Sequence, residues 1–376
     1  MMRLLHLTLC LFFLIACAEE SAPRSTANIK QVLGGNNTTG FLRADSPRLF
    51  EFPEDHGLHA GYRNEWWYIT GNLYSAEGRH FGYQVTFFNV AARAPATTQT
   101  RETTATAASS NWNSERLWMA HFALTDVDAN SHHAVERFSR ENPGLAGAQL
   151  NPFKVWLDDW QLVGTGNDFP WHLKLTDQEL SLSLNLNSVK KPVLQGDQGL
   201  SQKNQTAGSA SYYYSLTRLQ TSGEIKVGDE LFTVSGNSWL DREWSSSVLG
   251  PDQSGWDWFS LQFDDGQELM YYQLRNLNGQ SHAYSQGNWT DAAATQHLIS
   301  PADINLQEQQ WWTSPAGVQY ATAWLLSYQG RQWRVQAVVD AQWMDLSFQY
   351  WEGAVNVLDP VNGSVLGSGY LEMVRQ

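Results

Sequence analysis

The sequence predicts an all-β fold of two antiparallel β-barrel domains packed together. Short runs of alternating apolar and polar residues recur between turn residues, as in antiparallel strands. No long stretch shows the 3.6-residue period of a helix. The length of 376 residues exceeds the usual size of one domain. Closed barrels are expected because closure removes the exposed edges of a sheet.

The N-terminus predicts export. Arg3 supplies a basic start, Leu4 to Leu14 form an apolar segment too short to span a membrane, and Leu14-Ile15-Ala16-Cys17 resembles a bacterial lipobox. Residues 1–17 are therefore predicted to be a lipoprotein signal peptide, with Cys17 as the lipidated residue. A plain secretory signal ending near Ala18 is the alternative. We expect an exported bacterial lipoprotein held by its lipid in the outer membrane, facing the periplasm.

The next segment predicts a tether and then two domains. Residues 18–48 are rich in Ser, Ala, Thr, Asn and Gly, a composition typical of a flexible linker. The first domain is predicted over residues 49–243 and the second over residues 244–376. The two cysteines are Cys10 and Cys17, so the body after the signal has no disulfide and depends on its cores for stability.

Strands are expected throughout both domains. In the first domain we expect them at Trp67–Tyr74, Phe81–Val90, Trp118–Asp126, Trp156–Gly164, Trp171–Leu175, Leu180–Leu186 and Tyr212–Leu219. In the second we expect them at Trp258–Phe263, Glu268–Arg275, Gly279–Trp289, Gln319–Tyr328, Trp333–Val339, Phe348–Val357 and Gly363–Glu372. The polar segment Ala91 to Glu115 predicts a long loop or lid. Pro301 to Ile304 predicts at most a short helical turn.

The segment from Trp239 to Arg275 is the leading site candidate, because it sets carboxylates among indole rings. Asp257 lies between Trp256 and Trp258 in the sequence, and burying an unpaired charge costs several kcal/mol or raises its pKa. With 18 Trp in the chain, such a site suits an apolar ligand.

An earlier segment has a similar pattern. Glu65 precedes an aromatic run, a turn follows at Glu77-Gly78, and Tyr83 stands five residues after that Gly. The later segment repeats this with Asp265-Gly266 and Tyr271, which indicates a weak internal repeat.

Four motifs carry a family resemblance: EWWYITGNL from Glu65, SWLDREWSSS from Ser238, GWDWFSLQFDDGQELMYYQLR from Gly255, and YWEGAV from Tyr350. Together they resemble the bacterial AttH-like proteins, often called predicted secreted hydrolases, which are related to the carotenoid 1,2-hydratases and to kievitone hydratase. The resemblance implies two lipocalin-like barrels with a binding cavity. For the hydratase members it implies addition of water across an isolated C=C bond without a metal. Carotenoid hydratases have Asp followed by His where this chain has Asp241-Arg242.

Hydration of an alkene needs a strong acid, stabilisation of a cation, and a delivered water. A carboxyl group kept protonated in an aromatic site can act as the acid, which makes Asp257 and Asp241 candidates. Glu65 or Glu243 would hold the water. Indole faces stabilise cations by roughly 0.5 to 2 kcal/mol each. The predicted ligand-binding residues are Trp66, Trp67, Trp239, Trp256, Trp258, Tyr83, Tyr271, His121 and Arg275.

Structural alternatives stand beside these roles. Strand alternation would put Asp257 on the face opposite the flanking Trp residues, where it could cap a turn or pair with Arg242 or Arg275. One of Trp66 and Trp67 would then lie in a core.

Other classes of function have little support. The formal net charge of −14 and the absence of a basic cluster argue against nucleic acid. His56 and His59 have no acidic partner at a recognisable spacing, so no metal site and no cofactor are predicted. A serine hydrolase is disfavoured because no GxSxG motif occurs.

The function expected from the sequence is therefore that of an envelope lipoprotein that binds an isoprenoid or lipid-like hydrophobic molecule. It would catalyse acid-assisted hydration or isomerisation of a C=C bond without a metal, as a hydro-lyase would. The alternatives are a non-catalytic lipocalin-type carrier, and an export or assembly factor with an envelope protein as partner.

Overall fold

The computed structural model describes residues 38–95, 116–166, 168–247 and 249–375. The predicted signal peptide, Cys17, most of the tether and most of the Ala91 to Glu115 segment lie outside this range. Within it, the one helical element is the short 3₁₀ turn η1 (Glu54–His56). In these residues no helix has the length and apolar character needed to cross a membrane.

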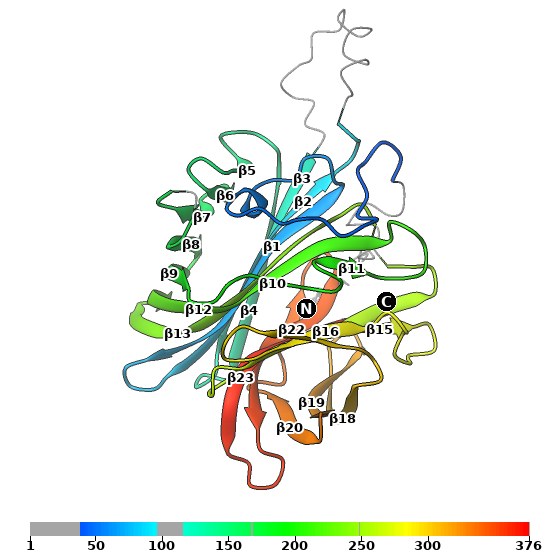
Figure 1. Ribbon diagram of the computed structural model, residues 1–376. Helices are drawn as coiled ribbons and strands as arrows, with labels where there is room; N and C mark the ends of the chain where they lie inside the picture. The colour runs from blue at the N-terminus through cyan, green and yellow to red at the C-terminus, as the bar shows by residue number, and fades with distance from the viewer. Residues whose placement is uncertain (1–37, 96–115, 167, 248, 376) are drawn as a thin grey trace, which may run out of the picture.

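The first sheet contains thirteen strands in the described chain (Figure 1). They are β1 (Asn64–Ser75), β2 (His80–Ala91), β3 (Arg116–Asp126), β4 (Ser131–Arg140), β5 (Ala146–Gln149), β6 (Lys154–Leu157), β7 (Trp160–Gly164), β8 (Trp171–Asp177), β9 (Leu180–Ser188), β10 (Val193–Leu194), β11 (Leu200–Gln202), β12 (Ala210–Val227) and β13 (Glu230–Ser245). Their order is β4-β3-β2-β1-β13-β12-β9-β8-β7-β6-β5, with β10 and β11 paired to β12. The sheet curls into a near-barrel around one apolar core that contains Trp67, Trp118 and Trp171.

The second sheet contains ten described strands. They are β14 (Gln253–Phe263), β15 (Glu268–Asn276), β16 (Gln286–Thr290), β17 (Gln296–Ile299), β18 (Ile304–Thr313), β19 (Gln319–Tyr328), β20 (Arg331–Ala337), β21 (Trp343–Asp345), β22 (Gln349–Leu358) and β23 (Val365–Arg375). The order is β17-β16-β15-β14-β23-β22-β20-β19-β18, with β21 paired to β22. Its own core includes Phe259, Trp324 and Trp351. All strand pairs in both sheets are antiparallel, so the predicted all-β fold of two packed lipocalin-like barrels is confirmed.

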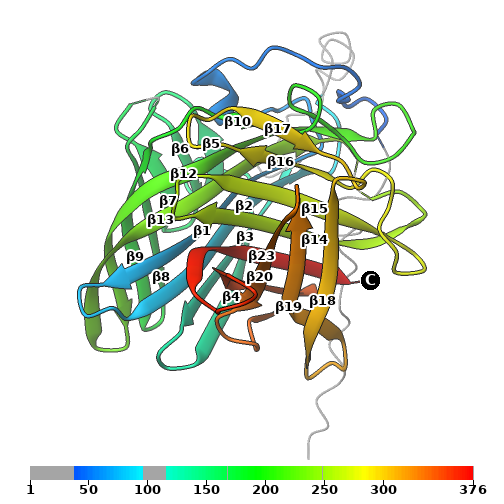
Figure 2. The ribbon, with the colours of Figure 1, turned by 60° about the horizontal axis from the view of Figure 1, so that its bottom comes forward.

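A third apolar cluster joins the two barrels. It takes Tyr68 and Trp239 from the first sheet and Trp258, Ala354 and Tyr370 from the second. Figure 2 shows β1 and β2 of the first sheet lying across β23 of the second. Strands at this junction are buried on both faces, because one face lines their own barrel and the other meets the neighbouring barrel. Successive residues of such a strand therefore belong to different cores.

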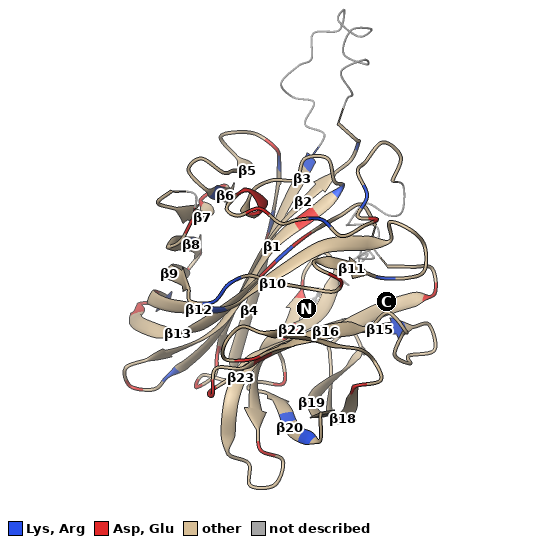
Figure 3. Ribbon diagram, in the orientation of Figure 1, with Lys and Arg blue, Asp and Glu red and all other residues tan. Residues whose placement is uncertain are grey.

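Several predicted strands differ from the structure. The predicted strand Trp156–Gly164 is two strands, β6 and β7, joined at Asp158, which has a positive φ of 53°. In place of the predicted strand Gly279–Trp289, β16 begins only at Gln286. Strands β4 and β18 were not predicted. They contain many polar residues and their inward-facing residues are only half-buried, so the alternating apolar pattern is weak. Charged residues are spread over loops and strand ends of both barrels (Figure 3).

A candidate site between the barrels

A cavity of about 130 Å³ lies at the junction of the two barrels. Its walls come from β1, β2, β12 and β13 on one side and from β14, β15, β22 and β23 on the other. The aromatic lining residues are Trp66, Trp256, Trp258, Phe88, Phe348, Tyr68, Tyr213, Tyr272 and Tyr350. The carboxyl groups are those of Asp241, Glu243, Glu352 and Glu372, and the remaining residues are Thr86, Ser201, Lys203, Leu249 and Leu274.

Asp241 lies on β13, on the face that meets the second barrel. Its Oδ1 accepts hydrogen bonds of 2.6 Å from Ser215 Oγ and of 2.6 Å from Trp239 Nε1, and its Oδ2 accepts one from the Tyr213 hydroxyl. Burial raises the pKa of Asp241 to about 7, and Glu243 nearby adds to the rise, while the three donors oppose it. The side chain is thus held rigidly and is poised between its two protonation states near neutral pH.

Glu352 and Glu372 form a pair of acids on the opposite wall. They face each other directly across β22 and β23, with Glu372 partly buried and Glu352 only 1% exposed. Burial raises the pKa of both carboxyl groups, and mutual repulsion raises that of Glu352 further; the pKa of Glu372 reaches about 8. The pair therefore retains protons at neutral pH.

The two members of this glutamate pair differ in their hydrogen bonds. Glu372 accepts a hydrogen bond of 3.0 Å from Trp256 Nε1. Neither carboxyl oxygen of Glu352 has a partner with ordinary hydrogen-bond geometry, so the Tyr68 and Tyr350 hydroxyls lower its pKa only in part. Glu352 is thus the less restrained acid of the two.

The fourth lining carboxylate has a cationic partner. Glu243 pairs with Lys203 at 2.9 Å, and these side chains keep 11% and 14% of their surface exposed. The Lys203 ammonium also lies 5.7 Å from the centre of the Trp66 ring. This part of the lining is therefore neutral overall and provides a cation over an indole face.

His121 lies behind the cavity wall. Its Nδ1 is 2.7 Å from the Tyr350 hydroxyl, and its Nε2 is 3.8 Å from Glu136 Oε2. Burial lowers the pKa of His121 to about 3, so the ring is neutral. It orients Tyr350 and does not itself line the cavity.

Asp257, a predicted acid, is not part of this site. Alternation directs it into the second barrel, where Arg275 and Arg375 each pair with it at 2.6 Å. Arg275 also pairs with Glu308 and so has a structural role there. Trp256 and Trp258, on the other face of β14, do line the cavity.

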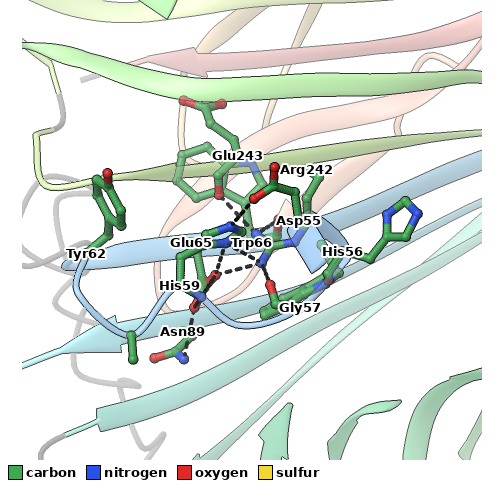
Figure 4. Close-up of polar contacts among 12 residues, drawn as sticks. Asp55, His56, Gly57, His59, Tyr62, Glu65, Trp66, Asn89, Arg242 and Glu243 are labelled. Atoms are coloured by element: carbon green, nitrogen blue, oxygen red, sulfur yellow. Dashed lines mark hydrogen bonds and ion pairs between the residues drawn. The ribbon is translucent and has the colours of Figure 1, made fainter. Parts of the chain in front are cut away.

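Glu65, the predicted water holder, also faces away from the cavity, into the first barrel. It pairs with Arg242 at 2.6 Å and accepts a hydrogen bond of 3.0 Å from the backbone of His59. The Arg242 guanidinium lies 3.7 Å from the centre of the Trp67 ring, and His59 stacks on Trp244 at 3.7 Å. Figure 4 shows this cluster beside η1, with Glu243 directed away from it.

Four further predicted ligand-binding residues lie in the cores or support a residue of the site. Trp67 stacks with Trp118 inside the first barrel. Tyr83 lies in the same core and Tyr271 in the core of the second barrel. Trp239 does not line the cavity but donates to Asp241. Of the predicted site residues, Asp241, Glu243, Trp66, Trp256 and Trp258 meet at the cavity.

The glutamate pair was missed in the sequence, although a signal was present. Glu352 and Glu372 are isolated acids in two apolar runs, and both are ten residues from Asn362 (362 − 352 = 10 and 372 − 362 = 10). Asn362-Gly363 is a turn signal, and a hairpin closed there brings the two acids to within one position of each other, while the register shift between Val357 and Leu358 makes them direct partners. The observed register has this pairing.

In the described ranges, no group of three or more His, Cys, Asp or Glu side chains is arranged to hold a metal ion. The carboxyl groups of the cavity are surrounded by aromatic rings, so its chemistry is that of proton transfer and cation stabilisation.

Comparison with known proteins identifies the family. The AttH-like family model matches residues 43–375. The chain belongs to the AttH-like family. No curated protein sequence matches it.

Solved structures share the fold. A putative AttH from Nitrosomonas europaea is 31% identical, with a TM-score of 0.76, over 88% of this chain and 99% of that one. Kievitone hydratase from Nectria haematococca is 13% identical, with a TM-score of 0.64, over 89% of this chain and 96% of that one. CghA is 9% identical, with a TM-score of 0.50, over 83% of this chain and 88% of its own. At these lower identities the second and third structures show a common fold alone.

The two residues of the Asp241-Arg242 dipeptide face opposite sides of β13. Asp241 faces the cavity, whereas Arg242 faces the interior of the first barrel and pairs with Glu65. The second position of the dipeptide therefore contributes to barrel stability in this chain, and the first contributes to the cavity.

We predict that Glu65→Gln destabilises the protein by about 3 to 5 kcal/mol at pH 7, because it leaves Arg242 buried without its partner. Arg242 holds the pKa of Glu65 at about 2 despite burial, below its ordinary value of 4.5. The stabilising contribution is complete above pH 4.5 and is lost as the pH falls towards 2. Urea unfolding at several pH values measures the difference. Glu230→Gln, at a largely exposed glutamate, is the control and should change stability by less than about 0.5 kcal/mol.

The opposite pH trend is expected for Glu372→Gln. The raised pKa means that the folded protein binds more protons than the unfolded chain between about pH 4.5 and 8. Wild-type stability therefore falls across this range as pH rises, and the amide variant removes that part of the slope. Thermal unfolding of both proteins from pH 5 to 9 should show the variant gaining on wild type. A constant difference in melting temperature would contradict the raised pKa.

Proposed function

We propose that the cavity binds a hydrophobic small molecule and catalyses acid-assisted hydration or isomerisation of a C=C bond without a metal. The observation that carries this proposal is a set of buried carboxyl groups with raised pKa values on facing walls of one aromatic cavity. The fold shared with kievitone hydratase, at 13% identity, is consistent with it.

The two walls suit different proton-transfer roles. The Glu352 and Glu372 pair retains protons at neutral pH, so it supplies the proton that adds to one alkene carbon. Asp241 has three donors that favour its carboxylate, so it accepts a proton from the attacking water. In isomerisation, Asp241 would instead take a proton from the carbon next to the cation. Return of this proton to the glutamate pair completes the cycle.

The cation formed between these steps would be stabilised by the cavity walls. Trp66, Trp256 and Trp258 present indole rings, each worth roughly 0.5 to 2 kcal/mol to a nearby cation. Asp241 as a carboxylate adds electrostatic stabilisation in a site of low dielectric. The wall therefore favours a charged intermediate over the neutral substrate, which is the requirement for catalysis.

The cavity volume limits which part of a ligand can react. A cavity of about 130 Å³ is near the size of an engineered cavity of about 150 Å³ that holds benzene. A branched alkene end group fits this volume, whereas a long polyene could enter only by one end.

A non-catalytic carrier is the second candidate, and the aromatic lining favours it equally. The two candidates differ in what they require of Asp241. A carrier needs the rings to exclude water and needs no carboxyl group with a raised pKa, which costs stability in an empty site.

Asp241→Asn tests the enzyme proposal. We expect kcat to fall by about 10² to 10⁴, the usual contribution of a general acid or base, with KM little changed. Turnover of short isoprenoid alcohols and alkenes would be followed by gas chromatography and mass spectrometry in ¹⁸O-labelled water. Glu308→Gln, at a partly buried ion pair of the second barrel that does not line the cavity, is the matched control and should keep full activity. Binding without turnover by wild type would favour the carrier.

We further propose that the mature chain is an outer-membrane lipoprotein with lipid attached at Cys17. A role as an export factor of the envelope is compatible with this location. The lipobox-like Leu14-Ile15-Ala16-Cys17 supports this. Growth with labelled palmitate should label the full-length protein, and Cys17→Ser should abolish both labelling and membrane fractionation. A Cys17→Ser variant that still incorporates palmitate would exclude the anchor at Cys17.

A further inference from the structure

The cavity lining has more acidic than basic side chains. The four lining carboxyl groups face a single basic side chain among the described residues, and that residue, Lys203, is paired with Glu243. In the described chain, no Lys, Arg or His forms an ion pair with Asp241, Glu352 or Glu372. Burying ionised carboxyl groups without cations is unfavourable, so the glutamate pair retains protons in the empty cavity, and a bound cation would favour its ionised form.

Among the acidic lining residues, Glu352 is the one whose surroundings indicate where a cation would bind. It lines the cavity at 1% exposure, and its carboxyl group has only the Tyr68 and Tyr350 hydroxyls beside it, neither in ordinary hydrogen-bond geometry and neither of them a cation. Buried polar atoms are rarely left without partners, which points to a group that the cavity receives from outside. Glu372, directly opposite on β23, has one donor, Trp256.

The walls beside this pair suit an organic cation. Trp66, Trp256, Trp258, Phe88 and Phe348 provide aromatic surfaces, and the Lys203 ammonium already lies over Trp66 at 5.7 Å. An alkylammonium group gains from both the ring faces and the apolar contact. A metal ion would instead need several converging oxygen or nitrogen ligands, which the described residues do not provide.

We propose that this cavity binds a small organic cation, an amine or quaternary ammonium group of about the size of benzene, with the Glu352 and Glu372 pair as its counter-charge. The proposal concerns the same cavity as the proposed function but does not depend on turnover. It extends the ligand class from neutral hydrophobic molecules to cations.

Binding would release a proton. In the empty cavity the two glutamates repel each other and retain protons; a bound cation favours the carboxylate and expels one proton to solvent. The complex then has the same net charge as the empty cavity, because the positive charge of the bound ligand replaces that of the released proton. The titratable groups that face the pair are Tyr68 on β1, Tyr213 on β12, Asp241 and Glu243 on β13, Lys203 before β12, Tyr272 on β15 and Tyr350 on β22. Of these, Asp241 also titrates near neutral pH and can share in the release.

Isothermal titration calorimetry with choline and its neutral isostere 3,3-dimethylbutan-1-ol tests the proposal on the wild-type protein. The two ligands have nearly the same shape and differ in charge. We expect choline to bind at least tenfold more tightly, a difference of about 1.4 kcal/mol. Titration in buffers of different ionisation enthalpy should show up to one proton released per choline and none for the alcohol. Affinity for choline should rise as the pH rises from 6 to 9.

Variants separate the role of the pair from general effects on the cavity. Glu352→Gln should weaken choline at least tenfold and remove the proton release, with binding of the neutral alcohol unchanged. Glu372→Gln should behave similarly, which guards against a folding defect in one variant. Glu308→Gln should bind choline like wild type.

Other outcomes would overturn the proposal in distinguishable ways. Equal binding of choline and the alcohol, or no binding of choline, excludes a cation site and leaves the proposed alkene chemistry intact. Choline binding that Glu352→Gln and Glu372→Gln do not weaken also excludes it. Charge-selective binding by a protein that turns over no alkene supports the cation site and contradicts hydration.

Discussion

The burial of the junction strands on both faces is the constraint on which the rest of this structure depends. In β1, β13 and β14, side chains point alternately into their own barrel and towards the neighbouring barrel, so the direction changes from each residue to the next. Asp241 and Arg242 are adjacent in sequence, yet one lines the cavity and the other fixes Glu65 inside the first barrel. A shift of one residue in register would exchange these environments and bury charges without partners.

Two kinds of buried charge follow from this arrangement. Inside the barrels, carboxylates have arginine partners, as in Asp257 with Arg275 and Arg375. At the junction, Asp241, Glu352 and Glu372 have hydroxyl and indole neighbours instead, and their pKa values rise. The barrels thus use ion pairs for stability, whereas the cavity retains protons that are available for chemistry or for exchange with a ligand.

Much of the fold could be predicted from the sequence, because alternation and turn residues are local signals. The all-β class, the two barrels and the family resemblance at Glu65, Ser238 and Gly255 are confirmed. The site was harder. Asp257 between two Trp residues looked like an acid, but sequence does not show which face of a doubly buried strand meets the cavity. To predict the glutamate pair, the register of the β22–β23 hairpin must be known. To predict that the pair lies opposite Asp241, the packing of the two barrels must be known, and no local sequence pattern contains that information.

The position of β23 has a consequence for how the molecule is made. This last strand inserts between β14 and β22, and it brings Glu372 to the cavity. The strands of the first sheet all precede β23 in the chain, so that barrel can close before β23 is synthesised, whereas the second sheet keeps a gap between β14 and β22 until β23 is added. A chain truncated before Val365 would leave that sheet split and the cavity open on one side.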